Sequence, residues 1–403
     1  MSGLGGRQRF RRRLLVVFLV LLIPAYGRQL ISSPTAGQDF RAFFAAAHVL
    51  AEGKNPYDWG VLGSTENRLY NAPLNQHPGD RAYYDFQPYP EGPWLAVGLV
   101  PLTGLPWQVA YALFAAAMAL CMLTAAWLCF RVLRFPVRAA AIATTCSLLI
   151  PVGFLNVFQG QVTPLIFLAV AAAWALAARN RPVLAGVVLT AIWVKPNLGL
   201  IAPLVLALFF PRMTWRLALG FAGGSLAAFI VAWLVMGAGL LQWPLELIQH
   251  WRAVQGVQPD IASIHSLYYP ALSGSLKVVA LALTMFAGLA YAIWSLSRTV
   301  EPLRRGLTVL LLWIAWLPFV HSYDTLLLLP VIGWLLLPAG DGWRRITVEC
   351  AAWAFAILPF AYFLGLRAGY FNGFTAFAVI ALLIAWHRAA ISQPTPARER
   401  LAA

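Results

Sequence analysis

Apolar runs bounded by arginines follow one another along most of this chain, and they restrict its fold more than any other feature. From about residue 14 to about residue 386, stretches rich in Leu, Ala, Val and Phe alternate with short basic turns. Of the 403 residues, 61% are hydrophobic and only 11% are charged. Water-soluble domains of this size do not have that composition, so we expect an all-α polytopic membrane protein.

The formal net charge of +15 arises mostly from basic residues at the ends of the apolar runs. Basic residues at these positions orient the spans and contact anionic lipid, so the charge does not indicate nucleic-acid binding. The four cysteines lie within apolar runs and lack metal-ligand spacing, which predicts buried thiols and no disulfide framework. The sequence contains no Walker loop, Rossmann fingerprint, HExxH motif or CxxC pair.

The distribution of arginines predicts about twelve crossings, with both termini in the cytoplasm. We expect full spans at residues 14–30, 107–130, 139–155, 162–178, 217–236, 276–296, 307–320, 325–337, 346–364 and 374–386. Two long segments, 32–92 and 237–275, would then lie outside, and the tryptophans of the second would suit an interfacial belt. Residues 1–390 would form a single domain in the plasma or inner membrane, followed by a disordered cytoplasmic tail at 391–403.

The stretch from 182 to 210 differs from the other apolar segments. Residues 182–194 and 198–210 are each too short for a full crossing, which needs about 20 residues, and Lys195-Pro196-Asn197 separates them. Basic residues on both flanks imply a hairpin that enters and leaves from the cytoplasm. Lys195 could extend to water along the bilayer edge, but broken helices also present their N-termini to anions, and we favour a functional lysine.

Residues 37–58 follow the first span and are predicted to form an amphipathic helix on the membrane surface, ended by Asn55-Pro56. Its apolar stripe runs from Phe40 to Ala51, and the polar residues beyond it, from 63 onward, read as a turn-rich segment. Asp39 stands at the start of this helix. It is either the helix N-cap or a catalytic carboxylate at a cleft on the membrane surface, and the two roles are compatible.

The other candidate polar residues collect on the outer side of the predicted topology. They are Glu91, Gln159, Gln161, His265, His321, Tyr323 and Asp324. His321 and Asp324 could share a helical face, or else act as a helix-end cap and an interfacial histidine. Tyr83, Tyr84 and Tyr89 are either interfacial anchors or platforms for a sugar ring. A lipid-phosphate donor would need such a layout, because its phosphate lies at headgroup depth and binds cations there.

Several ordered motifs resemble glycosyltransferase family 87, a group of integral-membrane GT-C transferases. The first is DFxxFFxAAxxLxxGxNPYD at residues 39–58, and Tyr89-Pro90 ahead of Pro101-Leu102 is the second. The remaining ones are Gly160-Gln161, Arg181-Pro-x-x-Ala-Gly186 leading to Val194-Lys195-Pro196, and His321-Ser-Tyr-Asp324 before a Leu-rich run. The chain departs from the family at PYPEGPW, where a simpler Tyr-Pro-Pro is usual, and Glu91-Gly92 is the extra pair.

This resemblance implies a GT-C fold and an inverting transfer of a sugar, such as mannose or another hexose, from a polyprenyl phosphate. The acceptor would be a lipid or a glycan at the outer face. By the same resemblance Asp39 would be the general base. Lys195 and His321 would stabilise the leaving phosphate, and Gln161, Tyr323, Asp324, Tyr89 and Glu91 would contact the sugar or the acceptor. No cofactor is implied, and Glu91 leaves a metal requirement open.

Two other functions fit part of the sequence. A transporter or lipid flippase would place a midplane substrate site at Lys195 between two half-helices, but the chain shows no internal repeat. A polymer ligase or another GT-C enzyme with a different donor is the third possibility.

Overall fold

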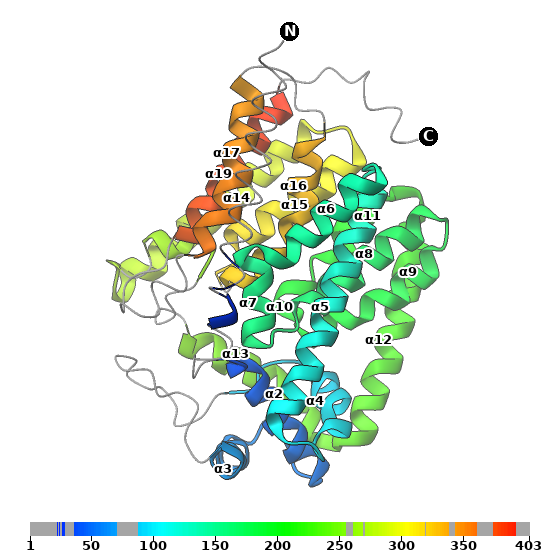
Figure 1. Cartoon of the computed structure of the whole chain (residues 1–403), viewed down its shortest axis with the longest axis vertical. Helices are drawn as coiled ribbons and strands as arrows, with labels where there is room; N and C mark the ends of the chain where they lie inside the picture. Colours follow the sequence, from blue (N-terminus) through cyan, green and yellow to red (C-terminus); the bar gives the residue numbers. More distant parts are fainter. Residues whose placement is uncertain are drawn as a thin grey trace.

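Helices form every named element of the computed structural model, which describes residues 22, 24, 26–28, 36–70, 88–254, 261–268, 271–318, 320–337, 343–360 and 374–391 (Figure 1). Within these ranges there is no strand, and one isolated β-bridge pairs Ile261 with His321. The prediction of an all-α protein is therefore confirmed. The tail that was expected in the cytoplasm, most of the expected first span, and Tyr83 and Tyr84 lie outside the described residues.

The α-helices in chain order are α2 (Gln38–Ala51), α3 (Trp59–Tyr70), α4 (Pro93–Leu99), α5 (Trp107–Val132), α6 (Val137–Leu149), α7 (Pro151–Gln159), α8 (Thr163–Ala178), α9 (Pro182–Leu189), α10 (Pro196–Gly199), α11 (Ala202–Phe209), α12 (Thr214–Met236), α13 (Gln242–Val254), α14 (Gly274–Ser297), α15 (Pro302–Trp316), α16 (Leu329–Leu336), α17 (Trp343–Ile357) and α19 (Phe374–Ile391). The 3-10 helices are η1 (Val100–Leu102), η2 (Thr190–Val194), η3 (Pro211–Met213), η4 (Gly237–Leu241), η5 (Ile264–Leu267), η7 (Ser322–Leu328) and η8 (Leu358–Phe360).

Three stretches of the described chain are long and apolar enough to cross a membrane: α5, the 38-residue run Pro211–Ile248 that contains α12, and α14. Helices α6 and α7 make a fourth if they are counted as one span bent by 53° at Pro151. These helices identify a membrane protein, but twelve full crossings are not found among the described residues. Several expected spans are shorter or interrupted, because prolines and 3-10 turns divide them.

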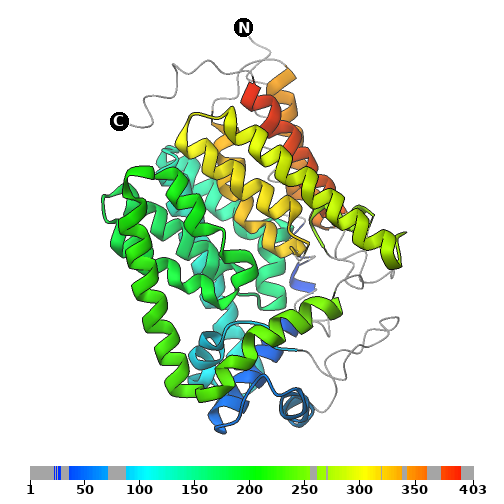
Figure 2. The same ribbon diagram turned by 180° about the vertical axis from the view of Figure 1, so that it is seen from behind.

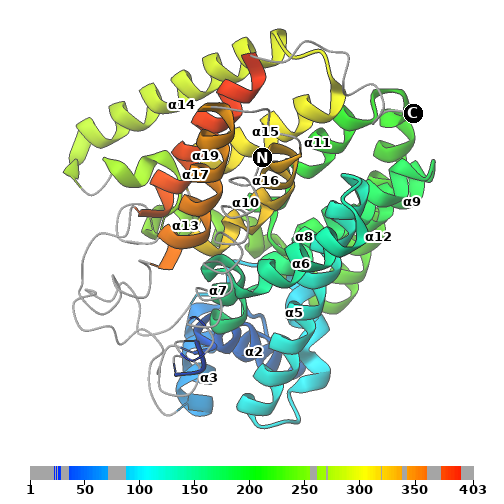
Figure 3. The same cartoon turned by 45° about the horizontal axis from the view of Figure 1, so that its top comes forward.

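Helices α12 and α14 lie on opposite flanks of the molecule, as Figures 2 and 3 show. In the most apolar 18 residues of each stretch, only 11% of the stretch that contains α12 and 6% of α14 is buried within the protein. Leu226 and Leu234 on α12 and Leu283 and Phe286 on α14 are among the exposed apolar side chains. Such faces suit contact with lipid, since hydrocarbon is as apolar as these side chains.

Helix α2 is buried rather than lying on a surface, which corrects the prediction of a surface-lying helix. Phe40, Phe43 and Phe44 and all the alanines of the helix except Ala51 are almost fully covered. Phe40 packs on Phe114 of α5 with ring centroids 5.0 Å apart. Helices α3 and α4 also pack against α2. The helix ends at Ala51, close to the predicted Asn55-Pro56 stop.

Two glycines fix the start of α2 against the end of α7. Gly37 has φ of 70° and donates its backbone N–H to the carbonyl of Phe158 at 2.7 Å. Gly160 ends α7 with φ of 74°, and a Cβ on it would lie 2.5 Å from Cβ of Phe40. Only glycine combines that backbone conformation with so close an approach, so this contact sets the position of Asp39.

Other local expectations need correction. Residues 59–70 form helix α3, whereas the sequence predicted a polar, turn-rich segment from Gly63 onward. Trp243, expected at an interface, is buried, and its indole N–H donates to the carbonyl of Pro90 at 3.2 Å. All four cysteines are free thiols, but only Cys129 is buried and Cys350 is exposed.

Candidate functional site

Lys195 lies at the break between η2 and α10, where the sequence predicted an interruption. Pro196 begins the next helix, and Lys195 itself has a non-helical backbone with φ of −138° and ψ of 76°. The residue is 5% exposed. Its Nζ lies 2.9 Å from Oδ1 of Asp324 and donates to Oε1 of Gln161 at 3.2 Å. The lysine therefore points into the protein, and the alternative interpretation, in which Lys195 extends to water along the bilayer edge, is wrong.

Asp324 holds this lysine from the first turn of η7. Its side chain is fully buried, and Oδ1 also accepts a hydrogen bond from Oγ1 of Thr163 at 2.6 Å. Its Oδ2 accepts from the backbone N–H of His321 at 3.1 Å, which completes a capping box with His321 as the N-cap. The expected cap is therefore present, but at the start of η7 and not at the end of the preceding helix α15, and the same carboxylate is the partner of the buried ammonium.

His321 and Tyr323 flank this ion pair. Their rings stack with centroids 5.1 Å apart and an interplanar angle of 15°. Nζ of Lys195 lies 4.7 Å from the centroid of the Tyr323 ring, a cation–π distance. Asn156 of α7 donates from Nδ2 to the carbonyl of Tyr323 at 2.9 Å, which ties η7 to α7.

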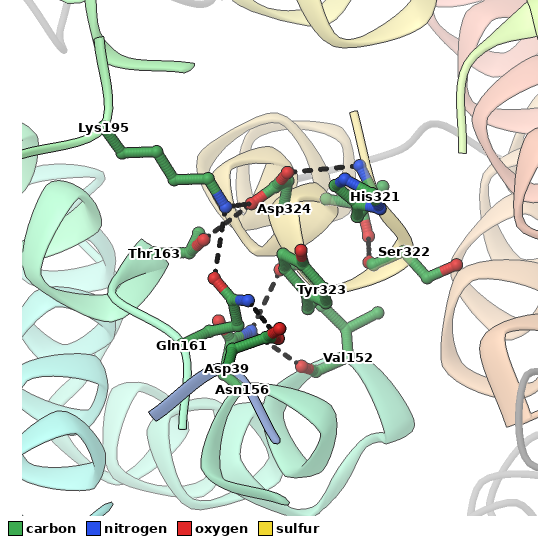
Figure 4. Close-up of polar contacts among 11 residues, drawn as sticks. Asp39, Val152, Asn156, Gln161, Thr163, Lys195, His321, Ser322, Tyr323 and Asp324 are labelled. Carbon is green, nitrogen blue, oxygen red and sulfur yellow. Dashed lines mark hydrogen bonds and ion pairs between the residues drawn. The ribbon is translucent and has the colours of Figure 1, made fainter. Parts of the chain in front are cut away.

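Asp39 comes from the first turn of α2, and Gly37, not Asp39, is the N-cap residue. The interpretation of Asp39 as the helix cap is therefore wrong. Its Oδ2 instead accepts a hydrogen bond from Nε2 of Gln161, while Oε1 of the same amide accepts from Lys195. Gln161 thus bridges Asp39 and the Lys195–Asp324 pair, as Figure 4 shows. We call Asp39, Gln161, Thr163, Lys195 and Asp324 the polar centre.

Glu91 approaches the polar centre from the segment ahead of α4. Gly92 donates its N–H to the carbonyl of Val194 at 2.9 Å, which places this segment beside the residue that precedes Lys195. Glu91 is 8% exposed, and its Oε2 is buried with no hydrogen-bond partner among the described residues. The pKa of Glu91 is raised to about 7, chiefly because the carboxyl group is buried; Lys195 lowers this pKa, and Asp39 and Asp324 contribute to raising it.

Tyr89 is hydrogen-bonded to the segment that carries Glu91 and to the start of α4. Its hydroxyl donates to the carbonyl of Gly92 at 2.7 Å and accepts from the N–H of Ala96 at 3.0 Å. Its ring stacks on Tyr57 with centroids 5.7 Å apart, and the hydroxyl of Tyr57 donates to the carbonyl of Glu91 at 2.8 Å. Both tyrosines therefore hold the backbone that carries Glu91.

Two residues that contact the site were not singled out from the sequence as site residues, namely Thr163 and Asn156. Thr163 begins α8 two positions after Gln161, and Asn156 lies within the apolar helix α7. The signal that could have identified them is a polar side chain inside or at the start of an apolar run, since such residues need partners there. His265, in contrast, lies away from the polar centre, with Nε2 2.7 Å from the carbonyl oxygen of Trp316.

The arrangement offers one half-buried carboxylate beside a buried ammonium that is neutralised by a second carboxylate. A half-buried carboxylate can accept a proton from a bound hydroxyl, and a buried ammonium can bind an anionic oxygen. Across the part of the chain that is described, no group of three or more His, Cys, Asp or Glu side chains could hold a metal ion.

Comparison with known protein families identifies the family of this chain. Residues 89–318 match the model of glycosyltransferase family 87, and this range covers more than half of the chain. It includes Glu91, Gln161, Thr163 and Lys195, while Asp39 lies before it and His321 to Asp324 follow it directly. No curated protein matches the chain. With its all-α membrane fold and this match, the chain belongs to glycosyltransferase family 87.

Proposed function

We propose that this glycosyltransferase moves a hexose, such as mannose, from a polyprenyl-phosphate donor to a lipid or glycan acceptor at the outer face of the membrane. The observation that carries the proposal is the bridge from Asp39 through Gln161 to the buried Lys195–Asp324 pair. A lipid-linked donor accounts for a polar centre inside a protein whose flanking helices expose apolar side chains.

Asp39 is the general base in this proposal. It abstracts the proton of the acceptor hydroxyl as the oxygen attacks the anomeric carbon, and the bond to the phosphate breaks on the opposite side. This single displacement inverts the anomeric carbon and needs one base and no enzymic nucleophile. The hydrogen bond from Gln161 fixes the orientation of the carboxylate.

Lys195 binds the phosphate of the donor. An ammonium has three N–H donors, and among the described residues two of them are used by Asp324 and Gln161. The third can meet a phosphate oxygen, whose negative charge grows as the bond to the sugar breaks. His321, whose ring stacks on Tyr323 beside Lys195, supplies a second donor to the same phosphate, and the Tyr323 ring borders the sugar.

The distribution of basic residues supports the proposed outward orientation, and the fold is proposed to be a single GT-C-like domain over residues 1–390. Helices α2, α3 and α13, from the two segments expected outside, gather at one end of the molecule (Figure 1). The basic residues Arg298, Arg304 and Arg305, by contrast, follow or begin the helices α14 and α15.

Labelling with an impermeant thiol reagent tests this orientation. Cysteine at Ser64, exposed on α3, should react in intact cells, and cysteine at Ser297, exposed at the end of α14, should react only after lysis. The native cysteines, including the exposed Cys350, are first replaced by serine. The reverse pattern would overturn the orientation.

The activity is tested by reconstituting the full chain in proteoliposomes with radiolabelled polyprenyl-phosphate hexose and a lipid acceptor extract. We expect label in the acceptor and none in vesicles that hold Asp39→Asn protein. A transporter or flippase would instead move labelled lipid across the bilayer and leave the sugar on its polyprenyl phosphate. That result would refute the proposed transfer.

A further inference from the structure

The polar centre and Glu91 together contain more negative than positive charge. Asp39 and Asp324 each interact electrostatically with Glu91, and Lys195 is the one cation that acts on Glu91 among the described residues. Lys195 is already paired with Asp324 at 2.9 Å. If all three carboxyl groups were ionised, this buried region would repel the anionic phosphate that the proposed donor carries.

Of the three carboxyl groups, Glu91 has the fewest hydrogen-bond donors that could stabilise a negative charge. Asp324 accepts hydrogen bonds at both oxygens, from Thr163, Lys195 and the backbone of His321. Asp39 accepts from Gln161. Oε2 of Glu91 is buried and has no such donor in the described part of the chain. An ionised carboxylate without a donor is costly to bury, whereas a neutral carboxyl group has an O–H that can donate.

The groups that surround Glu91 agree with a neutral state. Asp39 of α2 and Asp324 of η7 oppose its ionisation, and Lys195 favours it. Tyr57 and Tyr89 pack beneath its backbone and are neutral at physiological pH, because burial raises the pKa of both phenols well above the usual value. Glu246 of α13 acts on Tyr57 from the same side and adds no positive charge.

We propose that Glu91 takes part in the reaction as a neutral carboxylic acid that donates a hydrogen bond from Oε2 to a hydroxyl of the transferring sugar. This inference rests on the proposed function. In an inverting displacement the sugar lies between the base and the leaving phosphate. Here the base is Asp39, and the phosphate is bound by Lys195. The hydrogen bond from the N–H of Gly92 to the carbonyl of Val194 holds Glu91 next to the residue that precedes Lys195, and Glu91 interacts electrostatically with both Asp39 and Lys195. No proton is transferred from Glu91; it positions the sugar and lowers the negative charge around the phosphate.

The proposal gives the enzyme an alkaline limit. Glu91 with a pKa of about 7 is neutral below that pH and ionised above it. Ionisation removes the hydrogen-bond donor and adds a negative charge next to the phosphate, so kcat/KM should fall about tenfold for each pH unit above 7. The acid Asp39 must be ionised to act as a base, so it does not produce this alkaline limb.

The test compares wild-type protein with Glu91→Gln and Glu91→Ala in proteoliposomes, with polyprenyl-phosphate hexose as donor, from pH 5.5 to 9. Gln is a neutral isostere that still donates a hydrogen bond, so Glu91→Gln should keep wild-type activity at pH 6 and lose the alkaline decline. Glu91→Ala should lose about 10- to 100-fold at every pH through a higher KM for the donor, the usual effect of removing a buried polar contact. Glu246→Gln, a substitution of a second buried carboxyl group outside the polar centre, should keep the alkaline decline.

Three results would overturn the role of Glu91 while leaving the transferase intact. The first is a wild-type profile that stays flat to pH 9, and the second is a decline that persists in Glu91→Gln. The third is an inactive Glu91→Gln protein whose thermal unfolding midpoint at pH 6 equals that of wild type, because it would mean that a charged carboxylate is required. Absence of transfer by wild-type protein at every pH would refute the proposed function and with it the sugar contact.

A measurement without substrate separates these failures. Glu91 has a higher pKa folded than unfolded, so its stabilising contribution is complete below pH 4.5, the ordinary value, and is lost as the pH rises through about 7. The unfolding midpoint of wild type should therefore fall relative to that of Glu91→Gln as the pH rises from about 4.5 to about 7, and the difference should then stay constant up to pH 9. Equal midpoints over this range would show that Glu91 is not held neutral.

Discussion

The continuous helices α12 and α14 and the interrupted segments around the polar centre are built from similar apolar residues but have opposite surroundings. Along α12 and α14 the chain passes through more than twenty residues without a break and exposes Leu, Val and Phe side chains. The polar centre is assembled where helices stop or start: α2 begins near Asp39, α8 at Thr163, α10 after Lys195 and η7 before Asp324.

The contrast shows how an apolar protein accommodates charge. Helix ends leave backbone N–H and C=O groups without helical partners, and at membrane depth such groups are tolerated only inside protein. Side chains at these breaks can therefore satisfy one another and the free backbone groups, as Asp324 does for His321. Along their length the continuous helices have no unpaired backbone groups of this kind, and their apolar side chains face lipid.

Asp39 gives the largest expected effect. Asp39→Asn keeps the size of the side chain but cannot take a proton, so turnover should fall about 10²- to 10⁴-fold. Donor affinity and the unfolding midpoint should stay close to wild type, since the phosphate is bound elsewhere. Asp58→Asn is the matched control, because exposed Asp58 also stands at a helix start and accepts from the N–H of Val61 at 3.2 Å. Equal turnover in the two variants would remove Asp39 from the chemistry.

Lys195 should show the next largest effect. Lys195→Ala should weaken the affinity for polyprenyl phosphate about 10- to 100-fold, the value of a charge-assisted hydrogen bond. It also leaves Asp324 buried without its cation, which destabilises proteins by about 3–5 kcal/mol. Lys277→Ala on α14 removes a lysine from a continuous helix and should change neither property. Affinity is measured by titrating the detergent-solubilised proteins with fluorescent polyprenyl phosphate.

If Lys195→Ala fails to fold, Lys195→Arg provides the same test. It keeps the positive charge, but a planar guanidinium does not fit the position of a compact ammonium, so donor affinity should still fall. Unchanged affinity in a folded Lys195 variant would contradict the phosphate role.

The smallest effect concerns the joint between α2 and α7. Gly160→Ala places a methyl group 2.5 Å from Cβ of Phe40 at a positive φ, and overpacking of this kind costs about 1–3 kcal/mol. The unfolding midpoint should fall by several degrees, and activity should fall with it as Asp39 shifts. Gly223→Ala on α12 meets no atom within 4 Å and should be neutral or stabilising. If Gly223→Ala were destabilised and Gly160→Ala were not, the contact between Gly160 and Phe40 would not fix the position of α2 against α7.

Features that depend on local covalent chemistry could be predicted from the sequence. Proline at 196 stops a helix whatever surrounds it, so the break at Lys195 was found in advance. The start of α2 after Gly37, and the all-α class, follow equally from local signals and hydrophobic runs. Asp39, Gln161, Lys195 and Asp324 were all candidates, because a polar residue at membrane depth needs a partner.

What the sequence could not give is which surfaces meet. The apolar stripe of α2 fits a membrane surface and a protein core equally well, and only α3, α4 and α5 packing on it decides between them. Thr163 could not be identified from the sequence because threonine is common at the start of a helix. Only the structure shows that its Oγ1 lies 2.6 Å from Oδ1 of Asp324. The pairing of Lys195 with Asp324 joins residues 129 positions apart, and no periodicity reports such a contact.

That separation along the chain also has a consequence for biosynthesis. A chain inserted only as far as α12 carries Lys195 without its anionic partner, which belongs to η7. An unpaired ammonium at this depth draws in water or lipid headgroups, so the early helices cannot close around it. The polar centre therefore reaches its final form only after most of the chain has been inserted, and a ribosome-released fragment that ends before η7 should be recognisable to membrane proteases by its open interior.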